Sequence, residues 1–72
     1  MIPVEQIARL AELYDRYNNA LDPLSEGCAE AKRLFRELTD RLHAAHAPDV
    51  SFLDFRHELV SRCREYLRKN KP

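Results

Sequence analysis

Residues 20–25, ALDPLS, decide how many helices the chain forms. Asp22 can accept hydrogen bonds from the exposed amides of a helix start, and Pro23 is tolerated at a first helical position. This pair is therefore typical of the beginning of a new helix. We expect a first helix over residues 3–20 and a second over residues 23–46, with boundaries uncertain by about 2–4 residues.

The apolar pattern leaves a different arrangement open. Apolar residues recur three and four positions apart from Ile7 to Leu42, and the phase of this repeat does not change at Pro23. Proline interrupts a helix because it lacks an N–H and its ring clashes with the preceding turn, but it can also produce a kink. One long helix kinked at Pro23 is the alternative to two separate helices.

A third helix is predicted over residues 51–69. Ser51 followed three positions later by Asp54 resembles a capping box, in which the serine hydroxyl accepts from a free amide of the first turn. Val50 and Phe55 are spaced like a hydrophobic staple, a contact that fixes how the chain enters a helix. Together these residues indicate a well-defined helix start.

Composition favours an all-α fold. The chain has 72 residues with one glycine, no tryptophan and 33% charged residues, which is typical of helical sequences. We expect a single domain over residues 1–72, a small three-helix bundle. Short connections favour antiparallel neighbours, so the second and third helices should form a hairpin with the first packed alongside.

The first helix carries apolar residues around about half of its surface. Such a wide stripe needs two neighbouring helices, or one neighbour and a partner chain. A domain of this size buries only about 60% of its unfolded surface, so self-association is a plausible source of stability. We therefore predict a small protein-protein interaction or scaffolding module that self-associates into a larger helical bundle through Ile7, Leu10, Leu13, Tyr14, Tyr17 and Leu21.

Charge is balanced overall but not along the chain. Twelve basic residues match twelve acidic ones, yet residues 1–31 hold six acids and two arginines, whereas residues 32–72 hold ten basic residues and six acids. Opposite charges on two copies would favour their association. Arg56 falls within the apolar stripe of the third helix, where its stem can cover apolar surface or its head can meet the acidic first helix of another copy.

The basic end of the chain supports an alternative function, a nucleic-acid-associated regulator. Arginine and lysine side chains in this region can contact phosphates, although the zero net charge weighs against a strong pull on nucleic acid. The residues that would form this patch are Arg62, Arg64, Arg68, Lys69 and Lys71.

Histidines near the end of the second helix resemble a set of metal ligands. His43 and His46 are three apart, and Asp49 or His57 would have to complete the site. Pro48 ends the helix before Asp49, so the set does not share one face. We interpret the stretch as a helix end and turn, and expect no metal site.

Nothing in the sequence indicates catalysis. The chain has no glycine-rich phosphate loop and no nucleophile elbow, and Asp54-x-x-His57 occurs only once, whereas di-iron bundles need two such motifs. A small three-helix core also leaves little room for a substrate pocket. We expect no enzymatic activity and no cofactor.

The compartment is predicted from the cysteines and from hydropathy. Cys28 and Cys63 fall on apolar helix faces, where reduced cysteines behave as small hydrophobes, although a disulfide is the alternative. No apolar run approaches the ~20 residues that cross a bilayer. We expect a cytoplasmic protein with no membrane partner.

Overall fold

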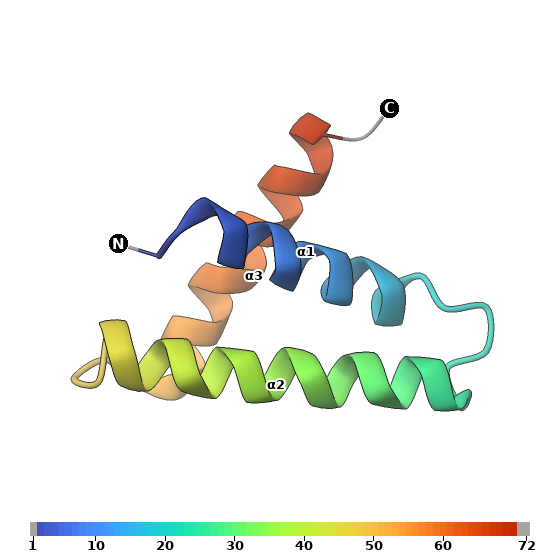
Figure 1. Ribbon diagram of the computed structural model, residues 1–72, viewed down its shortest axis with the longest axis horizontal. Helices are drawn as coiled ribbons and strands as arrows, with labels where there is room; N and C mark the ends of the chain where they lie inside the picture. Colours follow the sequence, from blue (N-terminus) through green and yellow to red (C-terminus); the bar gives the residue numbers. More distant parts are fainter. Residues whose placement is uncertain (1, 71–72) are drawn as a thin grey trace.

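The structure is a computed structural model that describes residues 2–70. Within this range the chain forms three α-helices and no strand, as Figure 1 shows. They are α1 (Val4–Asn18), α2 (Glu26–His46) and α3 (Phe52–Asn70). The predicted all-α three-helix fold is confirmed.

The α1–α2 loop (residues 19–25) is a turn and not a helix start. The backbone N–H of Leu24 donates to Asp22 Oδ1 at 3.0 Å, and the N–H of Ser25 donates to the Asp22 carbonyl at 3.1 Å. Asp22 thus closes a local turn with its own side chain, which is a common competing use of aspartate. Asp22 was expected to cap the second helix, and this assignment is wrong, although the helix starts three residues after Pro23 and thus within the expected range.

The second helix begins at Glu26, capped by the residue before it. The Ser25 hydroxyl accepts from the backbone N–H of Cys28 at 3.2 Å, which satisfies one of the free amides of the first turn. The alternative of one helix kinked at Pro23 is also wrong, because the chain reverses direction between α1 and α2 (Figure 1). The continuous apolar repeat reflects two helices that face the same core.

The first helix is the centre of the bundle. In Figure 1, α1 and α2 run antiparallel side by side, and α3 passes behind them at a steep angle. Helix α1 packs extensively on both α2 and α3, whereas α2 and α3 contact each other less. This differs from the expected hairpin of the second and third helices, because the short α2–α3 turn (residues 47–51) redirects the chain across α1 rather than back along α2.

The core explains the wide apolar stripe of α1. Leu10 and Ala11 are 0% exposed and lie between α2 and α3, so α1 has two neighbours within its own chain. Burying a large apolar side chain contributes about 1.5–3 kcal/mol, and most of the core consists of such residues. The cluster comprises Ile7, Leu10, Ala11, Leu13 and Tyr14 of α1, Ala31, Phe35 and Leu42 of α2, and Phe55, Leu59 and Cys63 of α3.

One polar side chain lies inside the core. Thr39 on α2 is fully buried, and its hydroxyl donates to the backbone carbonyl of Phe35 at 2.7 Å. This bond within the helix removes the cost of burying an unpaired hydroxyl. Thr39 therefore packs as an apolar residue would.

The start of α3 agrees with its prediction. Ser51 precedes the helix, and its hydroxyl accepts from the backbone N–H of Asp54 at 3.1 Å. The expected staple residues Val50 and Phe55 line the same pocket. The serine cap confirms the predicted helix start. The helix begins at Phe52, one residue after the expected Ser51.

Candidate functional site

The six residues expected at a partner interface are not brought together on the surface. Ile7, Leu10, Leu13 and Tyr14 are buried in the core of the single chain. Tyr17 is half-buried beside that core, and its ring meets the rings of Tyr14 and Phe35 edge-on. Leu21 lies beyond the end of α1, in the α1–α2 loop, and is fully exposed.

The α1–α2 loop exposes the two most accessible large apolar side chains of the described residues. Leu21 is 105% exposed and Leu24 is 93% exposed, so neither is covered by any part of residues 2–70. The turn around Asp22 holds them without any contact to the core. Both leucines belong to the α1–α2 loop, which lies at one end of the bundle (Figure 1).

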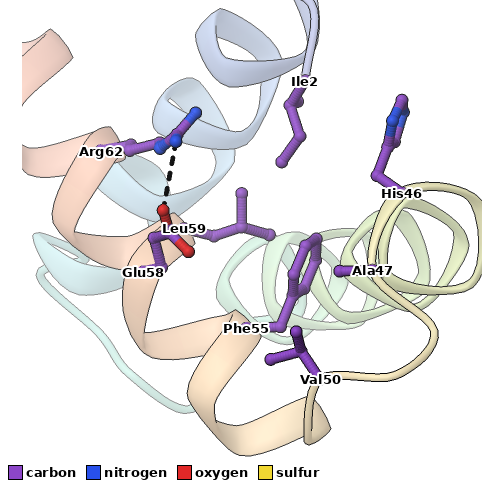
Figure 2. A pocket seen from close by; sticks show the side chains of 8 residues that line it. All are labelled: Ile2, His46, Ala47, Val50, Phe55, Glu58, Leu59 and Arg62. Carbon is purple, nitrogen blue, oxygen red and sulfur yellow. Dashed lines mark hydrogen bonds and ion pairs between the residues drawn. The ribbon is translucent and has the colours of Figure 1, made fainter.

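An apolar pocket lies at the opposite end, where α1 begins and α2 turns into α3. Its volume is about 160 Å³, and its wall consists of Ile2, Ala47, Val50, Phe55 and Leu59 (Figure 2). Phe55 and Leu59 are buried core residues, whereas Val50 is 45% exposed at the edge. The pocket is therefore a shallow opening onto the core.

Polar side chains surround this apolar pocket. Arg62 and Glu58 are joined by an ion pair of 3.1 Å on one side, and His46 stands on the other (Figure 2). A polar rim around an apolar centre is the usual arrangement of a protein-binding hot spot.

The histidine that most resembled a metal ligand is used to hold the α2–α3 turn. His43 Nε2 donates to the carbonyl of Val50, and the imidazole lies 5.7 Å from the Phe52 ring and 5.2 Å from the Phe55 ring, centre to centre. Within residues 2–70, no group of three or more histidine, cysteine, aspartate or glutamate side chains is placed to hold a metal ion. His43 is thus a structural link between α2 and α3.

The predicted basic patch is divided by ion pairs. Arg62 pairs with Glu58 and Lys69 pairs with Glu65, each at 3.1 Å on the exposed side of α3. The hydrogen bond and charge of Lys69 lower the pKa of Glu65, which agrees with this pairing. Two of the expected phosphate-binding side chains are therefore paired with acidic neighbours on the exposed side of α3.

Of the remaining basic residues of that patch, Arg64 and Arg68 line one shallow opening together with Glu65. Arg64 turns towards α1, where its Nε donates to the Tyr14 hydroxyl at 3.0 Å, and Arg68 lies exposed one turn further along α3. Lys71 lies outside the described residues. The structure thus brings Arg64 together with α1 and not with Arg62 or Lys69.

Both cysteines are free thiols packed in the bundle. Burial raises the pKa of Cys63 to about 11, so this thiol stays protonated at neutral pH. Cys28 is 2% exposed, and its Sγ lies 3.6 Å from the Tyr17 carbonyl. Low exposure and a raised pKa indicate a packing role for Cys63, and the burial of Cys28 indicates the same.

No family model, curated protein or solved structure matches this chain. Among residues 2–70, none of the helices combines the length and the apolar character that a membrane span requires.

Proposed function

We propose that the chain is a small cytosolic protein-interaction module that self-associates. The α1–α2 loop of one copy docks at the apolar pocket of the next, where one of Leu21 and Leu24 enters the pocket and the other packs against its edge. The exposure of this leucine pair, opposite a pocket of matching character on the same molecule, is the observation that carries the proposal. The interface therefore lies at the two ends of the bundle and not along the apolar face of α1.

The size of the apolar pocket supports this proposal. An apolar cavity of about 150 Å³ can hold benzene, so a pocket of about 160 Å³ has room for one branched side chain. Burying a leucine that is otherwise exposed contributes about 1.5–3 kcal/mol. Two leucines at one contact would give a weak, concentration-dependent association, as is usual for small interfaces.

The position of the two surfaces sets the form of the assembly. A contact between unlike surfaces is head-to-tail, and it produces a ring or an open chain of copies instead of a closed pair. The principal extents of the molecule are 36 × 27 × 17 Å. The α1–α2 loop and the α2–α3 turn lie at opposite ends of the longest axis, which is horizontal in Figure 1. The average mass should therefore rise with concentration beyond that of a dimer, unless a ring closes.

A cytosolic location is part of the proposal. Both thiols are free and buried, which is usual in a reducing compartment. The alternative role in nucleic-acid binding has less support, because Arg62 and Lys69 are paired with neighbouring glutamates. The proposed role is binding without catalysis.

Sedimentation equilibrium over a concentration series tests the proposal. The wild-type chain is expected to show an average mass that increases into the high micromolar range. Leu24→Ser and Leu21→Ser should each reduce the association constant by roughly tenfold, since each removes one buried leucine. Val50→Asp, at the edge of the pocket, should do the same from the other side of the contact.

Leu53→Ser provides the matched control. Leu53 is 60% exposed on α3 but belongs neither to the α1–α2 loop nor to the apolar pocket, so its loss should leave the association unchanged. A wild-type chain that stays strictly monomeric at high micromolar concentration would contradict self-association. An equal effect of Leu53→Ser and Leu24→Ser would contradict the assigned surfaces.

A further inference from the structure

A second opening lies between the end of α1 and the middle of α3, away from the apolar pocket. This arginine cleft has a volume of about 500 Å³ and contains Tyr14, Tyr17, Arg56, His57, Ser61 and Arg64. Guanidinium, imidazole and hydroxyl groups provide most of its polar atoms. Among the described residues, no carboxylate belongs to its lining. The cleft is therefore rich in hydrogen-bond donors and positive charge.

The helical spacing on α3 leaves both arginines of the cleft without an acidic neighbour. Four positions before and after Arg56 stand Phe52 and Val60, and the same positions around Arg64 are Val60 and Arg68. Every ion pair found within residues 2–70 joins residues four apart, and none includes Arg56 or Arg64. Their charges are therefore available to a ligand.

A buried tyrosine of α1 orients Arg64. The Nε of Arg64 donates to the Tyr14 hydroxyl at 3.0 Å, and the guanidinium carbon lies 6.0 Å from the centre of the Tyr14 ring. Tyr14 is 7% exposed and fixed in the core, so the contact limits the freedom of the arginine. The terminal amino groups of Arg64 make no hydrogen bond within the described chain and remain for a ligand.

Arg56 is associated with the neighbouring tyrosine. Burial raises the pKa of Tyr17, and the positive charge of Arg56 beside it acts in the opposite direction. Tyr14 and Tyr17 are three positions apart on α1, so one helix supplies two aromatic hydroxyls to the two arginines. Arg56 thus meets the tyrosine of its own chain, and the expected contact with another copy is not needed to explain its position.

Two guanidinium groups in a cleft without acids match the chemistry of a phosphate group. Arginine presents a planar set of N–H donors that bind phosphate oxygens in pairs, and such charge-assisted bonds are strong. Small-molecule sites usually have volumes of about 300–1,000 Å³, a range that includes this cleft. A nucleic-acid strand would need a longer row of free cations than α3 offers.

We propose that the arginine cleft binds the phosphate group of a small phosphorylated molecule through Arg56 and Arg64. Ser61 adds a hydroxyl to the lining of the same cleft, and the half-buried ring of Tyr17 borders the space for the organic part. This site is independent of the apolar pocket and of self-association.

Amide NMR of the full isotope-labelled chain tests the proposal, with phenyl phosphate and inorganic phosphate as probes and chloride at matched ionic strength as the background. Phenyl phosphate is expected to cause saturable shifts confined to the end of α1 and to residues 56–64 of α3. It should bind more tightly than inorganic phosphate, because Tyr17 can pack against its ring. Shifts that grow linearly, or that chloride reproduces, would overturn the proposal.

Variants that remove one positive charge each distinguish binding in the arginine cleft from nonspecific electrostatic attraction of phosphate to the protein. Arg56→Gln should weaken phenyl phosphate binding by roughly tenfold, since it removes one charge-assisted bond. Arg41→Gln removes the same charge from an exposed arginine of α2 that belongs neither to the cleft nor to an ion pair of the described residues, and it should leave the affinity unaltered. Arg64→Gln should also weaken binding, and the thermal transition by circular dichroism shows whether loss of its Tyr14 bond unfolds the chain. Equal losses in Arg56→Gln and Arg41→Gln would refute the assigned site.

A short single-stranded oligonucleotide completes the test. The proposal predicts weak binding with a salt dependence that corresponds to about one phosphate. A steep salt dependence, reporting several phosphates bound along α3, would overturn it in favour of a nucleic-acid surface.

Discussion

The α1–α2 loop and the α2–α3 turn are both short, and each ends in a serine that caps the next helix. They differ in what they contact. The α1–α2 loop is closed by Asp22 alone, and its leucines project into solvent. The α2–α3 turn is joined to the core by His43 and Phe55. Local hydrogen bonds are thus sufficient to reverse a chain, whereas crossing a second helix at a steep angle requires tertiary contacts.

Phe55→Ala tests whether the α2–α3 turn depends on contacts with the core, and it has the largest expected effect on stability. Phe55 is 5% exposed, forms the floor of the apolar pocket and packs against His43. Its truncation should lower the free energy of unfolding by about 3–5 kcal/mol, a large part of the stability of a chain this small. Urea denaturation followed by circular dichroism measures the loss. A cost below that of His43→Ala would show that the turn does not depend on the core.

His43→Ala should have an intermediate effect. The variant loses the hydrogen bond to the Val50 carbonyl and the contacts with two phenylalanine rings, which together contribute about 1–2 kcal/mol. His46→Ala is the control, because His46 is exposed at the end of the same helix. If the two variants lose equal stability in urea, His43 has no special role in holding the α2–α3 turn.

The serine caps, which both connections share, should have the smallest effect. Ser25→Ala and Ser51→Ala each remove one side-chain bond to a free amide, and each should cost about 1 kcal/mol of stability. Ser61→Ala, at an exposed position inside α3, should change the midpoint of thermal unfolding very little. A cap variant as stable as Ser61→Ala would show that the corresponding helix start is held by packing alone.

Several features of the fold could be predicted from residue spacing. The apolar repeats of α1, α2 and α3 are long and regular, and Ser51 with Asp54 forms a local signal that depends on no distant contact. The start of α2 could not be predicted in this way, because Asp22 and Ser25 are both suitable caps. The choice between them depends on how the loop spans the distance between two packed helices.

The two candidate binding surfaces, the apolar pocket and the arginine cleft, were harder to predict from the sequence than the helices. A helical projection identifies the apolar side of α1, but it cannot show that α2 and α3 of the same chain together bury Leu13 and Tyr14. The arginine cleft depends on a contact between Tyr14 and Arg64, which are fifty positions apart. Spacing along one helix could indicate only that Arg56 and Arg64 lack acidic neighbours.

The central position of α1 has a consequence for the order of folding during synthesis. This helix leaves the ribosome before α2 and α3, but its apolar residues need both of those helices to cover them. The nascent chain therefore exposes Leu10 and Ala11 until α3 has emerged, and a fragment that stops in the α2–α3 turn would remain open to chaperones or proteases. The core of this molecule can therefore form completely only after α3 has been synthesised.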